Sequence, residues 1–355
     1  MIRVLVVEDS AAARELIAHI LGSDAEIDVL GTASDGEQAL AAVRQLKPDV
    51  ITMDVHMPKM NGFEATRRIM EDRPTPIVIV SGAADVGGTA TAFRAVEAGA
   101  LAVLEKPAGA GHPDHRRTAE ALVQTVRLMS EVKVVRRWPR SAPQDDLISP
   151  EPQPVSPPGA AVLIAVGAST GGPPVVQTVL SELPCGFPAA VLLVQHIAAG
   201  FTAGFAEWLD RSSSLSVRLP VDGERILPGH AYVAPEGFHM KVGGSGTICL
   251  SNEEPENGLR PSISVLFRSV AQTYGHKAVG VLLTGMGKDG ALGLKSMKER
   301  GAVTIAQDKE TSVIHGMPGE AIRVGAARYI LPAGKIAAAL RGLVSDTAQH
   351  CHEPT

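Results

Sequence analysis

The sequence predicts an α/β protein with two doubly wound parallel-sheet domains joined by a proline-rich linker. Short apolar runs alternate with amphipathic stretches through most of the chain, which is the pattern of parallel strands connected by helices. One stretch interrupts this alternation with prolines that no helix or central strand would tolerate. A length of 355 residues also suffices for two full cores. We therefore expect a first domain over residues 1–129, a linker over 130–159, a second domain over 160–345 and a polar tail over 346–355.

The first domain contains five apolar runs, each followed by a helical pattern. Five β/α units of this kind are typical of a flavodoxin-like fold. Strands are expected at residues 3–7, 29–33, 50–53, 77–80 and 102–104, and helices are expected to begin near Ala11, Gly36, Gly62, Gly87 and Arg116.

The second domain begins with an apolar run that ends at a cluster of glycines and small residues, Gly167-Ala168-Ser169-Thr170-Gly171-Gly172. A buried strand followed by a very tight turn into a helix fits this pattern, so we expect a Rossmann-like sheet. Its strands are expected at residues 161–166, 190–194, 216–219, 231–233, 279–283 and 302–306, and a hairpin is expected between His230 and His239.

Composition excludes several classes of protein. A net charge of −5 and a pI near 6.1 argue against a nucleic-acid binder, which normally carries a basic stripe. Three dispersed cysteines without a C-x-x-C pair suggest reduced thiols and a cytoplasmic location. The first apolar run is short and followed directly by acidic residues, so it predicts a strand, neither a signal peptide nor a membrane insertion.

In the first domain, polar residues follow successive strands. Glu8 and Asp9 follow the first strand, Asp54 the third, Ser81 the fourth and Lys106 the fifth. Strand carboxyl ends converge on one edge of an open parallel sheet, and three carboxylates crowded there would bind Mg²⁺. A metal and a lysine would then stabilise a phosphoryl group transferred to Asp54. The alternative is that these acids merely cap helices, as Asp9 could do before Ala11.

In the second domain, Ser169 is the candidate nucleophile because a serine at a tight strand-to-helix turn is pushed out of the sheet edge. Following backbone N–H groups could stabilise an oxyanion there. The spacing also satisfies G-x-S-x-G. The same turn could instead hold a phosphate, so a non-enzymatic regulator that binds a nucleotide is the alternative, although G-x-G-x-x-G and Walker patterns are missing.

A serine nucleophile needs a base and a carboxylate that orients the base. His196 directly follows an apolar strand, and Asp289 lies in the glycine-rich loop after another. Strand ends should therefore deliver both residues to the edge that carries Ser169. His315 is the second candidate for the base, whereas His230 and His239 are expected to be structural.

The first domain resembles a response-regulator receiver domain. The resemblance rests on Glu8-Asp9, Met53-Asp54, Met57-Pro58, Asn61-Gly62, Val80-Ser81-Gly82 and Lys106-Pro107. It implies that a histidine kinase phosphorylates Asp54, that Ser81 and Lys106 contact the phosphoryl oxygens, and that Glu8, Asp9 and Asp54 hold Mg²⁺; a cis Lys106–Pro107 bond would fit. Val103 occupies the position of the usual aromatic switch residue, and Gly82 replaces the commoner alanine.

Outside the linker and the tail, nearly the whole chain resembles the chemotaxis protein-glutamate methylesterase family, CheB. The stretches that carry this resemblance are GASTGGP, LLVQHIAAGFTAGFAEWLD, GHAYVAPEGFHM, RPSISVLFRSVA, LLTGMGKDGALGL and AQDKETSVIHGMPGEAI. It implies a catalytic triad of Ser169, His196 and Asp289, with Thr170 and backbone N–H groups near Met286 beside the oxyanion.

The same resemblance implies the substrate and the partners. The substrate would be glutamate γ-methyl ester on a chemoreceptor, released as methanol, with deamidation of glutamines as a second activity. The receiver would restrain the second domain until it is phosphorylated. Ala198-Ala199 after His196 replaces a proline that the family often has. Metal binding by His350-Cys351-His352 is a weaker alternative use of the tail.

Overall fold

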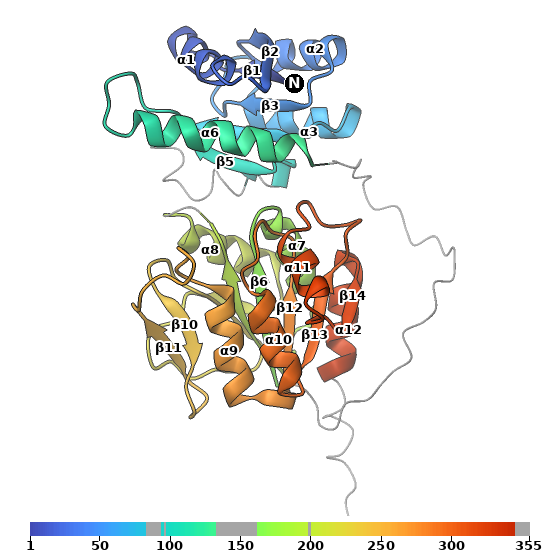
Figure 1. Cartoon of the computed structure of the whole chain (residues 1–355). Coiled ribbons are helices and arrows are strands. Elements are labelled where there is room, and N and C mark those ends of the chain that lie inside the picture. Colours follow the sequence, from blue (N-terminus) through green and yellow to red (C-terminus); the bar gives the residue numbers. More distant parts are fainter. Residues whose placement is uncertain (83–93, 96, 133–161, 198–199, 345–355) are drawn as a thin grey trace, which may run out of the picture. The chain divides into compact units, whose positions relative to one another are not determined.

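The computed structural model describes residues 1–82, 94–95, 97–132, 162–197 and 200–344 (Figure 1). The chain divides into two compact units, Met1–Ile148 and Ser149–Thr355. The helix expected near Gly87, Ala198-Ala199, nearly all of the linker and the tail with His350, Cys351 and His352 lie outside the described residues.

The first unit is a five-stranded parallel sheet in the order β2-β1-β3-β4-β5, as the flavodoxin-like prediction requires. Helices α1 and α6 contact each other on one face, and α2 contacts α3 on the other. Since both faces are covered, the central strands are continuous apolar runs. The strands are β1 (Ile2–Val7), β2 (Ile27–Ala33), β3 (Val50–Met53), β4 (Ile77–Ser81) and β5 (Ala102–Glu105), and the helices are α1 (Ala11–Gly22), α2 (Gly36–Leu46), α3 (Gly62–Asp72) and α6 (His115–Ser130).

Short polar side chains start three of these helices by accepting a hydrogen bond from the first turn. Asp35 caps α2 and Asn61 caps α3. At α1 the cap is Ser10, whose hydroxyl accepts from Ala13 N. Capping by Asp9 is therefore wrong, because Ser10 takes that position and Asp9 stays at the sheet edge.

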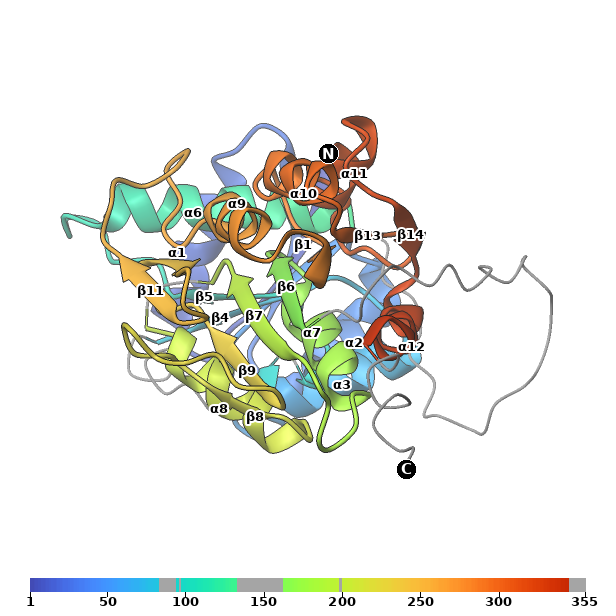
Figure 2. The same cartoon turned by 90° about the horizontal axis from the view of Figure 1, so that it is seen from below.

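The second unit is a seven-stranded parallel sheet in the order β14-β13-β12-β6-β7-β9-β8 (Figure 2). The chain moves outward from β6 through β7 on one side and through β12 on the other, so β6 lies at the topological switch point. The strands are β6 (Leu163–Ala168), β7 (Ala190–Gln195), β8 (Ser216–Arg218), β9 (His230–Val233), β12 (Ala278–Leu282), β13 (Val303–Gln307) and β14 (Tyr329–Leu331). The helices are α7 (Gly172–Ser181), α8 (Thr202–Ser212), α9 (Ile263–Thr273), η1 (Gly275–Lys277), α10 (Ala291–Glu299), α11 (Met317–Arg323) and α12 (Ala333–Val344).

The expected hairpin between His230 and His239 is wrong. His230 opens β9, which is paired on both sides, with β7 and β8. His239 opens β10 (His239–Val242), which pairs antiparallel with β11 (Ile248–Ser251) in a separate two-stranded sheet. Because both edges of β9 are already paired, β10 pairs with β11 instead. The buried Met240 of β10 packs in the core with Phe267 of α9.

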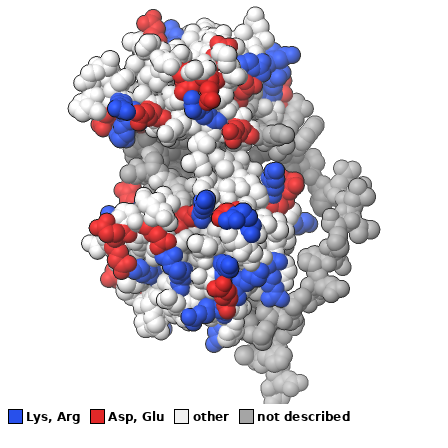
Figure 3. All heavy atoms as spheres, in the orientation of Figure 1, with Lys and Arg blue, Asp and Glu red and all other residues white. Residues whose placement is uncertain are grey.

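On the face drawn in Figure 3, acidic and basic side chains are interspersed over the described surface of both units. Among the described residues, no helix is both long and apolar enough to span a membrane.

Candidate active site

Ser169 follows β6 directly, at the switch point of the second sheet. The turn is tight because Gly171 adopts a positive φ of 75° and Gly172 N donates to Ser169 O at 2.8 Å. A side chain at Gly171 would also collide with Val313, since a Cβ there would lie 2.4 Å from the Val313 Cβ. The sequence between β6 and α7 therefore holds a half-buried serine at the edge of the sheet.

His196 follows the neighbouring strand β7, and its backbone lies beside Ser169. His196 N donates to Ala168 O at 2.9 Å, so the two strand ends are in register. The imidazole is 3.1 Å from Asp289, measured from Nε2 to Oδ2. Among the described residues, Ser169 Oγ makes no hydrogen bond to His196, and the backbone bond of His196 goes to Ala168, the residue before Ser169. Such contacts are often loose in the absence of substrate.

Asp289 lies in the loop after β12, at the amino-terminal end of α9. Burial alone would raise the pKa of this nearly buried carboxyl, but its hydrogen bonds outweigh burial and hold the pKa well below its ordinary value. Asp289 therefore stays ionised at neutral pH and has a fixed orientation. Its partners are His196 Nε2, Ser262 Oγ, Ile263 N, Ser264 N and Gly290 N.

The loop after β12 also packs against the nucleophile turn. A Cβ on Gly285 would lie 2.6 Å from Ser169 Cβ, so only a glycine allows this approach. The hydroxyl of the buried Thr284 donates to Thr170 O at 3.0 Å. Met286, the next residue along, is 52% exposed. Thr170 and Met286, the two predicted near-site residues, thus lie on either side of the Ser169–Gly285 contact.

Among the described residues, the other candidate histidines make different contacts. His315 bridges to the backbone of Gly285, and its Nδ1 lies 3.3 Å from Ser312 Oγ. Burial lowers the pKa of this ring. His239 is buried and accepts from Ser262 N, which fixes the start of α9. His196 is therefore the histidine that the structure pairs with Asp289.

Sequence reasoning missed four residues that build this site, namely Gln195, Ser262, Ser264 and Thr284. A serine just before an apolar helix does predict an N-cap, and Ser262 is one. Nothing in the sequence links it to Asp289, which is 27 positions away. Gln195 was detectable as a polar residue at the end of an apolar strand, but its partners were not.

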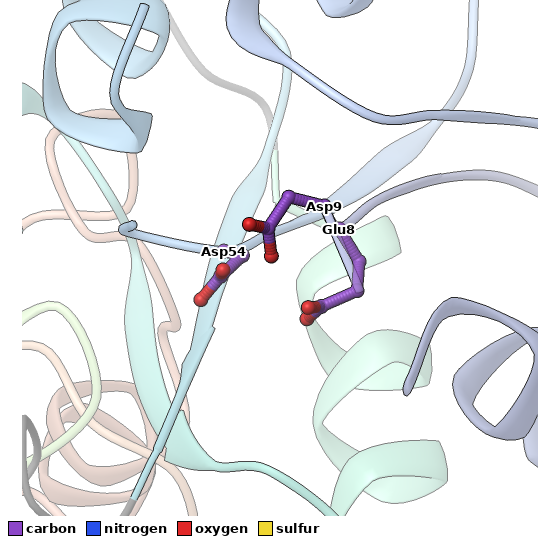
Figure 4. Close-up of side chains that lie close together, drawn as sticks. All are labelled: Glu8, Asp9 and Asp54. Atoms are coloured by element: carbon purple, nitrogen blue, oxygen red, sulfur yellow. The ribbon is translucent and has the colours of Figure 1, made fainter. Parts of the chain in front are cut away.

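The first unit gathers the predicted acidic cluster at the carboxyl ends of β1 and β3 (Figure 4). Oxygen atoms of Glu8, Asp9 and Asp54 all lie within 4.8 Å of one another. Lys106 Nζ lies 2.9 Å from Glu8 and 3.1 Å from Asp54 Oδ1. Ser81 ends β4, and its carbonyl accepts from Lys106 N at 2.8 Å. The structure thus brings together all five residues that the sequence singled out.

Burial raises the pKa of both Glu8 and Asp54, because one lysine does not compensate for two buried carboxylates. Burial would lower the pKa of Lys106, but Glu8 and Asp54 together raise it. Two buried acids beside the exposed Asp9 form an oxygen-rich set that suits a hard divalent cation. Among the described residues the cis peptide bond is Arg260–Pro261, so a cis Lys106–Pro107 bond is wrong.

Comparison with known proteins agrees with both halves of this description. Residues 4–112 match the family model of the response regulator receiver domain, and residues 164–340 match that of CheB methylesterase. A protein-glutamate methylesterase/protein-glutamine glutaminase of Nitrosospira multiformis is 56% identical over 98% of this chain and 99% of its own length. The chain belongs to the CheB methylesterase family. A relative of the same name from Geobacter metallireducens is 54% identical over 98% of this chain and all of its own.

A solved structure supports the fold of the methylesterase domain. The catalytic domain of Thermotoga maritima CheB methylesterase is 40% identical and matches with a TM-score of 0.51, over 52% of this chain and all of that one. The receiver and methylesterase domains are therefore both doubly wound α/β domains, as the sequence predicted.

Proposed function

We propose that this chain is a phosphorylation-regulated esterase that hydrolyses glutamate γ-methyl esters on chemoreceptors, releases methanol, and deamidates glutamines. Relatives that span nearly the whole chain are named for both activities. The observation that carries the assignment of residues is the 3.1 Å contact between His196 Nε2 and Asp289, beside the turn that exposes Ser169.

In this mechanism Ser169 Oγ attacks the ester carbonyl while His196 takes the hydroxyl proton. Because Nε2 faces Asp289, the nitrogen available to Ser169 is Nδ1. The same nitrogen then protonates the departing methanol, and a glutamyl ester on Ser169 remains. Water deprotonated by His196 attacks that ester, which regenerates Ser169 and releases a carboxylate. Asp289, held ionised, stabilises the imidazolium in both steps.

The tetrahedral intermediate carries a negative oxygen that needs N–H donors. Among the described residues, neither the backbone N–H of Thr170 nor that of Met286 has a hydrogen-bond acceptor. Both belong to segments in contact with Ser169, Thr170 as its neighbour and Met286 next to Gly285. These two groups are our candidates for the oxyanion hole.

In the receiver domain, Asp54 is the proposed phosphoryl acceptor from a histidine kinase. Glu8, Asp9 and Asp54 would hold Mg²⁺, which when bound supplies positive charge to the phosphoryl oxygens. Lys106 already contacts Asp54 and would neutralise a further oxygen, and Ser81 would donate its hydroxyl. Phosphorylation of Asp54 would then raise the activity of the methylesterase domain.

We propose the domain boundaries that the sequence predicted, namely a receiver over residues 1–129, a linker over 130–159, a methylesterase domain over 160–345 and a tail over 346–355. The proposed substrate, a chemoreceptor, and the proposed phosphodonor, a histidine kinase, imply that the enzyme works in the cytoplasm. We propose that it neither binds nucleic acid nor inserts into a membrane.

The test is methanol release from methylated receptors, with and without a small phosphodonor. We expect release by the wild-type chain, stimulation by the phosphodonor, and a loss of several orders of magnitude in Ser169→Ala. Ser296→Ala is the control, because the Ser296 hydroxyl donates to the carbonyl of Leu292 within the same helix, α10. Equal release by Ser169→Ala and the wild type would contradict the assignment.

A further inference from the structure

Gln195, the last residue of β7, is a buried amide that joins the proposed nucleophile to the proposed base. Its Nε2 donates to Ser169 O and to His196 O, at 2.8 Å each. The side chain is almost completely buried, at 4% exposure. Both amide hydrogens are therefore used on the backbones of two proposed catalytic residues.

The first of these bonds fixes an entire peptide unit. In a trans peptide the carbonyl of one residue and the N–H of the next point in opposite directions. Gln195 Nε2 and Gly172 N both hold Ser169 O on the buried side of the turn. The N–H of Thr170 must consequently point away from the buried amide, toward the exposed side of the turn.

The surroundings of Gln195 are shaped to hold it in this orientation. A Cβ at Gly172 would lie 2.3 Å from Gln195 Oε1 and 2.8 Å from Ala168 Cβ, so a larger residue there would displace the amide of Gln195. Among the described residues, Gln195 Oε1 has no hydrogen-bond donor. A buried acceptor without a donor is destabilising, which a residue selected for packing alone would avoid.

We propose that Gln195 is a positioning residue for the esterase reaction. Its amide orients the Ser169–Thr170 peptide through the bond to Ser169 O, so that Thr170 N–H faces the developing oxyanion. Its second bond, to His196 O, fixes the backbone of the proposed base. This inference rests on the proposed function. In this proposal Gln195 does not contact the substrate and acts by setting the direction of the Thr170 N–H.

The key variant is Gln195→Met, which keeps the length of the side chain but removes both donors and the unpartnered oxygen. We expect kcat for methanol release to fall about 10- to 100-fold, less than the loss of a whole oxyanion donor. KM should change less than about threefold, because the ester's ground-state contacts remain. The thermal midpoint should move little, because Ser169 O keeps its bond from Gly172 N, and the loss of the donor to His196 O is offset by the removal of the unpartnered Gln195 Oε1.

The matched control is Thr304→Val, in β13 of the same sheet. Thr304 is fully buried, and its hydroxyl donates to Ala326 O and accepts from Arg328 N, far along the chain from the turn. Its loss should lower the thermal midpoint while kcat stays within about twofold of the wild type. Gln195→Met should therefore lower kcat with little change in the thermal midpoint, whereas Thr304→Val should lower the thermal midpoint with little change in kcat.

A second readout is the rate of Ser169 modification by a fluorophosphonate, which forms a tetrahedral centre with a phosphoryl oxygen in the oxyanion position. In Gln195→Met this rate should fall in parallel with kcat. A folded Gln195→Met with wild-type kcat and labelling rate would overturn the proposal. So would a decrease in kcat that simply follows the loss of stability. If Ser169→Ala releases as much methanol as the wild type, the proposed function fails instead, whatever Gln195 does.

Discussion

Asp54 and Asp289 occupy equivalent places in two similar sheets, yet their surroundings are opposite. Asp54 follows β3 in the receiver and shares its space with Glu8 and Asp9, and burial raises its pKa. Asp289 lies in the loop after β12 and accepts hydrogen bonds from His196 and the start of α9, which lower its pKa. Both carboxylates lie at the carboxyl-terminal edge of a parallel sheet, and the hydrogen-bond donors around each one determine its pKa and its chemical role.

This contrast explains the two chemistries we propose. A carboxylate with one shared lysine as its cation retains free oxygen atoms for a metal and a phosphoryl group. A carboxylate whose oxygens are already occupied by donors cannot bind anything new, but it can hold an imidazole in one orientation.

The largest expected effect is on the rate of the Asp289→Asn variant. An amide cannot hold the imidazole of His196 in the required tautomer, so kcat should fall about 10³- to 10⁴-fold. Methanol release in the steady state is the measurement. A loss of less than tenfold would mean that another group orients His196.

The same Asp-to-Asn change should affect stability with opposite signs in the two domains. Asp289→Asn leaves buried donors without an anion and should lower the local free energy of unfolding by about 2 kcal/mol. Asp54→Asn removes a buried charge whose pKa burial raises, so it should increase the local free energy of unfolding. Hydrogen exchange of peptides from β3 and from β12 reports each domain separately. Changes of the same sign in both domains would refute the comparison.

Mg²⁺ should stabilise the receiver and leave the methylesterase domain unchanged. At ten to a hundred times its dissociation constant, a bound ion adds about 1.4 to 2.7 kcal/mol. Asp9→Asn should reduce this gain, whereas Asp28→Asn on the exposed surface of β2 should not. Titration with Mg²⁺ monitored by the same hydrogen exchange is the measurement. Stabilisation of β12 instead of β3 would contradict the assignment of the cluster.

The smallest expected effect is a difference in pH dependence. The lowered pKa of Asp289 means that its contribution is complete above the unfolded-state pKa of about 3.9 and is lost as pH falls below it. The raised pKa of Asp54 means that its destabilisation disappears earlier, as pH falls toward that same value from above. The stability gain of Asp54→Asn should thus shrink before the stability loss of Asp289→Asn does. Denaturation curves between pH 7 and pH 3 would show the order.

Much of this could be read from the sequence because parallel strands order their carboxyl ends. The apolar runs ending at Val7, Met53 and Val166 predicted strands, and the polar residues that follow them had to share an edge. This argument predicted that Glu8, Asp54 and Lys106 lie close together, and the structure shows them in contact. It predicted the same of His196 and Asp289, which are also in contact.

What could not be predicted depends on contacts between residues far apart in the sequence. The hairpin after His230 failed because β9 is paired on both sides, which is a property of the whole sheet. The anchoring of Asp289 on Ser262 and the two bonds of Gln195 follow from how α9 and β7 pack. No local pattern encodes these contacts.

The most direct test of the central claim is mass-spectrometric mapping of the site that a fluorophosphonate modifies in the full-length protein. The account predicts a single adduct on Ser169, formed much more slowly in His196→Ala and Asp289→Asn. Modification of a different serine, or no dependence on His196 and Asp289, would contradict it.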